Sequence, residues 1–312
     1  MSSIKAISIV IPVTERGDDL LPLLNGYHSS ISETGIEVEY IIVLTPPFAF
    51  LADALKQKNS ESLPIIIILL NRNYGEAGVL KIGVDHAAFA HILTLPPYEQ
   101  VSPTELPGFI ESLADNDAVV VNRSPRIDPL PNKLQALVFR SILRMLAYNT
   151  PKDAGCGIRL GSKEVFDEIK LYGDLHRFFL ILADQAGFKT AEIDIPQSKP
   201  DAHRRIYSLR TYLSRTLDIL TVGFLTRFYK KPLRFFGTAG AISAFVGLIG
   251  LSYIAIQRLF FDISAGDRPL LVLFALFFVL GVQLIAIGLV GETIIFTNSK
   301  DNKEYRIRKI IN

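Results

Sequence analysis

Short apolar runs alternate with segments of helical periodicity along residues 1–203. The apolar runs are expected to form β-strands at 7–13, 37–44, 64–70, 91–95 and 117–122. The periodic segments between them are expected to form helices at 17–32, 48–58, 75–90 and 103–113. Apolar strands that alternate with helices are typical of a parallel sheet covered on both faces. With right-handed crossovers, the pattern predicts an α/β, doubly wound, mostly parallel sheet.

The pattern changes in the last third of the chain, where residues 235–257 and 269–291 contain no charged residue. Each run has about the 20 apolar residues that are needed to cross the core of a bilayer. We expect two transmembrane helices joined by the short link 258–268; a buried hairpin in a soluble protein is the alternative. The glycines of the first run suit close packing of helices in lipid.

Positive charge lies on one side of this hairpin. The link carries only Arg258 and Arg268, whereas basic residues precede the first run and follow the second: Arg204, Arg205, Arg210, Arg215, Arg227, Lys230, Lys231, Arg234, then Lys300, Lys303, Arg306, Arg308 and Lys309. Basic residues are retained on the cytoplasmic side of a membrane. We therefore expect an integral membrane protein in a lipid bilayer, with both termini and the N-terminal domain in the cytoplasm.

Two amphipathic segments, 132–150 and 207–228, add basic residues to an apolar stripe. The second stands just before the first apolar run, so it is expected either to lie in the headgroup layer or to pack on the domain. The expected organisation comprises a cytosolic domain at 1–203, juxtamembrane amphipathic helices at 204–234, the two spans within 235–292, and a basic cytosolic tail at 293–312.

Composition narrows the class of protein. The 312 residues are 49% apolar, and 33 basic residues nearly balance 31 acidic ones, which does not indicate a nucleic-acid partner. The single cysteine excludes an intramolecular disulfide. The N-terminus has no long apolar region and no small-residue cleavage pattern, so it is expected to be the first strand and not a signal peptide.

A series of motifs resembles one known family. SIVIPV at 8–13 resembles its opening strand, NRNYG at 71–75 its "RNxG" turn, DAGCGIR at 153–159 its "DxGCGxR" segment and LYGDLHRF at 171–178 its "ExHRF" segment. LDILT at 217–221 and KPLRFFG at 231–237 resemble the lead-in to a two-span anchor. The ordered set resembles the family 2 glycosyltransferases of the polyprenyl-phosphate type, which include dolichol-phosphate mannose synthase and bactoprenol glucosyltransferase types.

The resemblance implies a GT-A-like domain that transfers a sugar from a nucleotide sugar to a polyprenyl phosphate. In such enzymes a carboxylate reads the base, and a DxD-like pair binds Mg²⁺ or Mn²⁺ at the diphosphate. Carried over onto this chain, it implies the catalytic residues Asp153, His176 and Arg177. It also implies the substrate-binding residues Pro12, Asn73, Gly75, Gln100, Arg159, Arg204, Arg205 and Tyr207.

The chain departs from the family at the two donor-side acidic motifs. Leu44-Thr45-Pro46-Pro47 stands in the place of "DDGS", and Pro96-Pro97-Tyr98-Glu99-Gln100 stands in the place of "DADxQ". Glu99 is the only acid there, either a single metal ligand or a solvated loop acid, and one carboxylate makes a poor Mg²⁺ site. The lipid-facing "GxSKY" segment is also altered, since AHRRIY at 202–207 has no glycine or serine.

Asp153 and Cys156 leave further alternatives open. Asp153 either faces the cleft or caps the glycine-rich turn, and Cys156 is expected to be structural.

Three functions follow from this pattern. The chain is a working transferase with an unusual donor or with basic side chains in place of the metal, or an inactive relative that serves as a membrane scaffold or regulatory partner. The third alternative binds a polyprenyl phosphate without transfer. A homo-oligomer is expected from anchored relatives of this class.

Overall fold

The computed structural model describes residues 4–17, 20–61, 63–127, 151–153, 155–169, 175–203, 232–261 and 269–298. The chain divides into two compact units, Met1–Val222 and Gly223–Asn312. The expected helical segments 132–150 and 207–228 and the tail beyond 298 lie outside the described residues. The finer division at 203, 234 and 292 remains a prediction.

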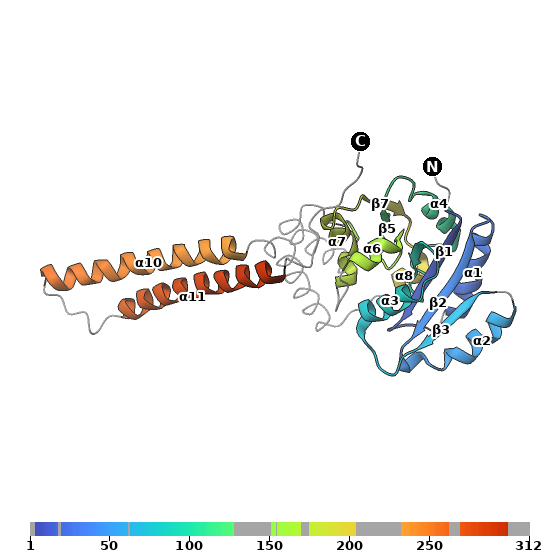
Figure 1. The fold of residues 1–312 in the computed structure, drawn as a ribbon, viewed down its shortest axis with the longest axis horizontal. Helices are drawn as coiled ribbons and strands as arrows, with labels where there is room; N and C mark the ends of the chain where they lie inside the picture. Colours follow the sequence, from blue (N-terminus) through green and yellow to red (C-terminus); the bar gives the residue numbers. More distant parts are fainter. Residues whose placement is uncertain are drawn as a thin grey trace. The chain divides into compact units, whose positions relative to one another are not determined.

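The described part of the first unit is built on a seven-stranded sheet (Figure 1). Its strands, in chain order, are β1 (Ala6–Val13), β2 (Glu37–Leu44), β3 (Ile65–Leu69), β4 (His91–Thr94), β5 (Ala118–Arg123), β6 (Arg159–Ser162) and β7 (Thr190–Ile195). The spatial order is β3-β2-β1-β4-β6-β5-β7. All neighbours are parallel except that β6 runs antiparallel to β4 and to β5. The predicted doubly wound, mostly parallel sheet is confirmed.

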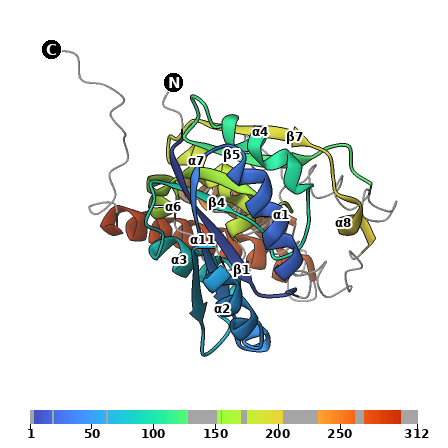
Figure 2. The ribbon, with the colours of Figure 1, turned by 90° about the vertical axis from the view of Figure 1, so that its right-hand side faces the viewer.

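Helices cover both faces of the sheet. One apolar cluster joins the sheet to α1 (Leu20–Ser32), α2 (Leu51–Glu61) and α4 (Leu106–Glu111). A second cluster on the other face joins it to α3 (Gly75–Asp85), α6 (Lys163–Glu168) and α7 (Phe179–Gln185). Figure 2 shows α1 and α4 on one side of the strands and α3 and α6 on the other. The described residues of this unit also form short elements: η1 (Pro46–Phe48), η2 (Pro103–Glu105), η3 (Leu175–Phe178) and α8 (Lys199–His203).

Burial along β1 explains why a nearly continuous apolar run was needed. Ile7, Ile9 and Ile11 belong to the cluster on the α1 side, whereas Val10 belongs to the cluster on the α3 side. Successive side chains of a strand point to opposite faces, so a strand buried on both faces is apolar at nearly every position. The polar exception is the buried Ser8, whose hydroxyl donates a hydrogen bond to the Glu39 carboxylate.

The structure departs from the predicted elements at several places, and β7, α6, α7 and α8 have no counterpart among them. The helix expected at 75–90 ends at Asp85, and His86 closes it with backbone bonds to Gly83 and Val84. The short strand β6 was not expected; it is the strand that breaks the parallel pattern. It contains Gly161, where a Cβ would lie 3.1 Å from the Cβ of Ala118, so the close approach of β5 requires the missing side chain.

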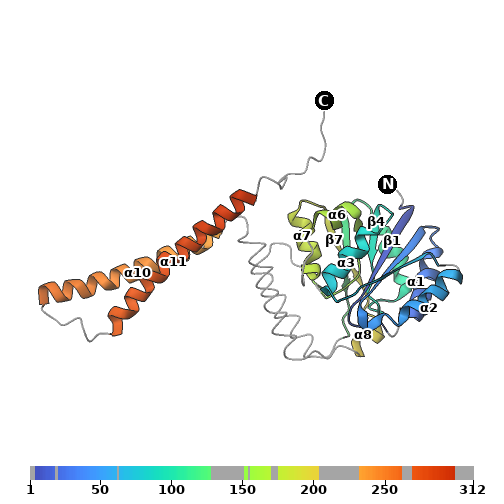
Figure 3. The same ribbon diagram turned by 60° about the horizontal axis from the view of Figure 1, so that its bottom comes forward.

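The second unit contains two long apolar helices, α10 (Pro232–Phe261) and α11 (Pro269–Asn298), which pack along each other (Figure 3). Each has 30 residues and is therefore about 45 Å long at 1.5 Å per residue. Both are long and apolar enough to cross a membrane. Large apolar side chains remain exposed on them, for example Leu259 at 79% and Phe296 at 72%. This exposure does not fit the alternative of a buried soluble hairpin.

Glycines bring the two helices into backbone contact. A Cβ on Gly281 would lie 2.4 Å from the backbone nitrogen of Ala244 and 2.5 Å from the carbonyl oxygen of Gly240. The Ser243 hydroxyl donates a hydrogen bond to the carbonyl of Phe277 on the other helix at 2.8 Å. The predicted use of glycine for close helix packing is thus confirmed.

Candidate functional site

The carboxyl ends of β1 and β4 lie side by side, and the strand order reverses between them. From β1 the chain adds β2 and β3 on one side, and then returns to add β4 on the other. In open α/β sheets ligands bind at such a point. Pro12, predicted to bind substrate, is buried within β1 opposite Val43.

The loop that follows β4 is rigid and largely internal. Pro96 and Pro97 are buried, and the Gln100 side chain is held on both of its polar atoms. Its Oε1 accepts hydrogen bonds from the Gly157 N–H at 2.8 Å and the Cys156 thiol at 3.3 Å. Its Nε2 donates to the Tyr98 hydroxyl at 2.9 Å. Gln100, predicted to bind substrate, therefore joins this loop to the glycine-rich turn of residues 153–157.

A metal ion does not suit the side chains of this loop. Tyr98 stands at the second acidic position of the "DADxQ" pattern, and the Glu99 carboxylate accepts a short hydrogen bond from the Ser198 hydroxyl. Among the described residues no three His, Cys, Asp or Glu side chains come together as a metal site. Mg²⁺ and Mn²⁺ prefer several oxygen ligands, with carboxylates foremost, and a single occupied carboxylate does not supply them.

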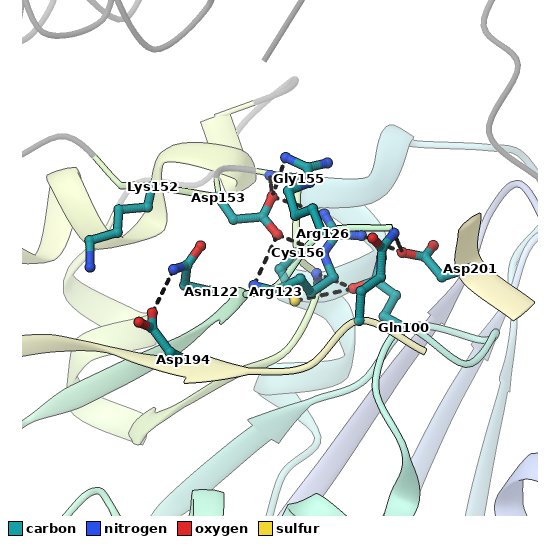
Figure 4. A network of polar contacts seen from close by, with 12 residues as sticks. Gln100, Asn122, Arg123, Arg126, Lys152, Asp153, Gly155, Cys156, Asp194 and Asp201 are labelled. Carbon is teal, nitrogen blue, oxygen red and sulfur yellow. Dashed lines mark hydrogen bonds and ion pairs between the residues drawn. The ribbon is translucent and has the colours of Figure 1, made fainter. Parts of the chain in front are cut away.

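Behind the glycine-rich turn lies a buried ionic network (Figure 4). The Arg123 guanidinium, at the end of β5, donates to both oxygens of Asp153, from Nε at 2.6 Å and from Nη2 at 2.8 Å. Its Nη1 donates to Asp201 at 2.7 Å, and Gln197 donates to the same Asp201 oxygen at 2.7 Å. The Arg123 and Asp201 side chains are fully buried, and that of Asp153 is 2% exposed.

This network fixes the conformation of the turn. Burial by itself would lower the pKa of the Arg123 guanidinium, but the charges of Asp153 and Asp201 raise it well above its usual value. Asp153 also accepts the Gly155 N–H at 3.1 Å. Asp153 was expected either to face the cleft or to cap the turn, and these hydrogen bonds favour the cap. Arg123 was not among the predicted site residues, since in the sequence it is only a basic residue at the end of an apolar run.

Cys156 lies in the same turn and is buried. Burial raises the pKa of its thiol to about 11, since the effect of the nearby Arg123 charge is smaller. A thiol with such a pKa is a poor nucleophile, which agrees with the expected structural role.

A second charged cluster gathers around the beginning of α3. Its Glu76 pairs with the buried His176 of η3, whose Nε2 lies 3.1 Å from Oε2 of the carboxylate. Burial would raise the pKa of Glu76, but the His176 hydrogen bond and the charges of His176, Arg159 and Arg177 together lower it to about 2. The structure thus brings together three predicted site residues and adds Glu76, which the sequence did not single out.

The His176 ring and the Arg159 guanidinium differ in their hydrogen bonds. The Nδ1 atom of His176 is buried without a hydrogen-bond partner in the part of the chain that the structure describes. The Arg159 guanidinium donates from Nη2 to the Cys156 carbonyl at 3.3 Å. Arg159 begins β6 opposite Thr94, the last residue of β4, so it lies at the carboxyl end of β4.

The turn before α3 is closed by Asn73. Its Oδ1 accepts the Gly75 N–H at 2.8 Å, and Gly75 adopts a φ of +76°, which favours glycine. Asn73 and Gly75, both predicted to bind substrate, therefore shape the entry to α3. The remaining predicted residues, Arg204, Arg205 and Tyr207, lie outside the described residues.

Comparison with known proteins shows similarity along the whole chain, although no family model matches it. The chain is 28% identical to an undecaprenyl-phosphate 4-deoxy-4-formamido-L-arabinose transferase of Photorhabdus laumondii, covering 99% of this chain and 95% of the relative. The protein of that name from Pectobacterium atrosepticum is 29% identical, covering 100% of this chain and 95% of the relative. A dodecaprenyl-phosphate galacturonate synthase of Rhizobium johnstonii is 26% identical, covering 97% of this chain and 92% of the relative.

Solved structures show the same fold. A glucosyl-3-phosphoglycerate synthase from Mycobacterium tuberculosis, bound to Mn²⁺, UDP and phosphoglyceric acid, matches with a TM-score of 0.52 at 14% identity. The match covers 72% of this chain and 78% of that one. A complex of that synthase with Mg²⁺ and UDP also has a TM-score of 0.52, at 13% identity, covering 72% and 79% of the two chains. The predicted resemblance is therefore confirmed: the first unit has a GT-A glycosyltransferase fold, and the whole chain is similar to polyprenyl-phosphate sugar transferases.

Proposed function

We propose that the chain transfers a sugar from a nucleotide sugar to a polyprenyl phosphate. The observation that carries this proposal is the full-length similarity to polyprenyl-phosphate transferases, which spans the sheet unit and the two apolar helices together. The relatives are named as transferases, which favours an enzyme over the scaffold and the lipid-binding alternatives.

The proposed reaction is a displacement at the anomeric carbon of the sugar. An oxygen of the lipid phosphate attacks that carbon, the bond to the nucleotide diphosphate breaks, and the diphosphate leaves with the bonding electron pair. The lipid phosphate is already ionised, so no strong base is required. What the reaction needs is positive charge around two groups of phosphate oxygens.

We place the chemistry at the cluster of Arg159, His176 and Arg177 beside the beginning of α3. Two guanidinium groups supply charge there, and the beginning of α3 adds the positive end of its helix dipole. The Glu76 carboxylate positions the His176 ring by pairing with Nε2 at 3.1 Å. The buried Nδ1 atom is then the ring atom that is left for a substrate oxygen.

The two apolar helices are proposed to anchor the chain in the bilayer, where its lipid substrate also resides. Basic residues are frequent before the first apolar run and after the second, and scarce in the link 258–268. This distribution supports cytoplasmic termini. A reporter inserted in the link is expected to be active outside the cytoplasm, and one at either terminus inside it. The homo-oligomer stays a prediction, to be tested by sedimentation in detergent.

The test of transfer uses the full chain in detergent with undecaprenyl phosphate. UDP- and GDP-sugars are offered, including the UDP-linked formamido-arabinose and galacturonate, and lipid-linked sugar is detected by mass spectrometry. We expect a product with one donor, and a roughly hundredfold lower rate in R177Q because a transition-state charge partner is removed. The control K56Q removes an exposed charge on α2 and is expected to retain the rate. Folded protein that gives no product with any donor would favour the scaffold alternative.

A further inference from the structure

Arg16 and Tyr98 meet at the point where the strand order reverses. Arg16 follows the end of β1, and its guanidinium carbon lies 4.7 Å from the centre of the Tyr98 ring, which follows the end of β4. This distance is typical of a cation–π contact. The pair lines a cavity of about 460 Å³ together with Pro22, Leu23, Gly26, Glu99, Pro103 and Pro200.

The Tyr98 ring is a fixed support for that guanidinium. Its hydroxyl accepts the Gln100 amide at 2.9 Å, and Gln100 is itself bound to Gly157 at 2.8 Å. Pro96 and Pro97, both buried, precede the ring and restrict the backbone. A guanidinium stacked on a rigid ring loses less side-chain entropy when it binds an anion than a mobile one does.

Tyr98 stands where the resembling family has an acidic residue. It is aligned with the second acid of the "DADxQ" pattern, the residue type that would hold a divalent metal. In this chain the acid is replaced by an aromatic ring, and a cation from the neighbouring strand end lies over the ring. The positive charge at this position therefore belongs to the Arg16 side chain.

We propose that Arg16, supported by Tyr98, binds a phosphate group of the substrate in place of a divalent metal. The group is assigned to the diphosphate of the nucleotide sugar, because the strand end after β4 is the donor side of the site. This assignment rests on the proposed function, whereas phosphate binding without a metal does not require that transfer occurs.

Glu99 lines the same cavity, and its negative charge opposes an anionic ligand. Its hydrogen bond with the Ser198 hydroxyl ties it to the segment between β7 and α8. The two readings of this residue predict opposite effects. If Glu99 bound a metal, E99Q would weaken nucleotide binding; if Arg16 binds the phosphate directly, E99Q strengthens it because a repulsive charge is removed.

The first experiment needs no variant. Calorimetric titration of the detergent-solubilised full chain with UDP is run in excess EDTA and in excess Mg²⁺. We expect the same Kd in both. Binding that is lost in EDTA and restored by Mg²⁺ overturns the proposal.

The variants R16Q, R16K and E99Q then test the side chains, with K56Q as the matched charge control. R16Q is expected to weaken UDP binding by roughly tenfold to a hundredfold, the range set by a charge-assisted hydrogen bond. R16K keeps the charge but loses the planar stacking, so it is expected to fall between wild type and R16Q. Unchanged binding in R16Q, with an unchanged melting temperature, overturns the proposal.

Titration with farnesyl phosphate distinguishes the two sources of phosphate. A loss in R16Q that affects UDP and spares farnesyl phosphate supports the donor assignment, and the reverse result overturns it. The proposed function is judged separately: sugar transfer that stops in EDTA retains the function and rejects the role of Arg16. Metal-independent UDP binding that depends on Arg16, without transfer to any lipid, retains the role and rejects the function.

Discussion

Replacement of Arg123 by Met is expected to destabilise the first unit severely. The change keeps most of the side-chain volume but removes the partner of two carboxylates, Asp153 and Asp201, which are 2% and 0% exposed. Removal of one member of a buried ionic group leaves an uncompensated charge and costs about 3–5 kcal/mol. In a unit of this size each kcal/mol lowers the melting temperature by about 2–4 °C, so a decrease of roughly 6–20 °C is expected.

The assay is thermal unfolding of the full chain in detergent, followed by circular dichroism because the chain has no tryptophan. R126M is the matched control, since Arg126 lies 3.8 Å from Asp153 and is 22% exposed; its loss is expected to cost about 0–1 kcal/mol. The triple variant R123M/D153N/D201N is expected to recover much of the loss, because no buried charge remains. If R123M melts within about 2 °C of the wild type, the reasoning is refuted.

Three further results are expected. The pKa of Glu76 lies near 2 in the folded chain, below its usual value of 4.5, so the pair with His176 stabilises the fold above about pH 4.5 and is lost as the pH falls toward 2. Between pH 2 and 6 this pair should change the free energy of unfolding by about 1–2 kcal/mol, allowing for solvent screening. Thermal melting across that range should show the change in the wild type and not in E76Q. The Cys156 thiol, with a pKa raised to about 11, should react with iodoacetamide at pH 8 only after unfolding, as followed by mass spectrometry. G281L should separate α10 from α11 and increase hydrogen exchange in both helices, whereas L280I, at an exposed position, should leave exchange unchanged.

The sheet could be predicted because its strands carry their signal locally. β3 is apolar at every position, and β1 and β2 are apolar apart from Ser8, Glu37 and Glu39. β6 carries no such signal, since it has four residues, two of which are Arg159 and Gly161. Its place is set by pairing with β4 and β5, and no local pattern encodes that pairing.

The candidate site was predictable only in part, for a related reason. Motifs pointed to Asp153, Gln100 and His176, but not to the residues that each of them contacts. Arg123 is 30 positions from Asp153 and 78 from Asp201 along the chain, so the network exists only after folding. The buried contacts of Asp153 favour the turn cap of its two expected roles, because both carboxylate oxygens accept hydrogen bonds from Arg123.

The two buried arginines of neighbouring strands differ in how far their charge is compensated. The charge of Arg123 is compensated, because three of its nitrogen atoms donate hydrogen bonds to Asp153 and Asp201. The charges of these carboxylates raise the pKa of Arg123. Arg159 is different, since burial lowers its pKa and the one hydrogen bond that the structure describes for it is to a backbone carbonyl. A buried cation in that condition gains more from an incoming phosphate than a paired one does. Arg159 is therefore the buried arginine that a substrate anion would stabilise, and a phosphate bound there should raise the melting temperature of the wild type more than that of R159Q.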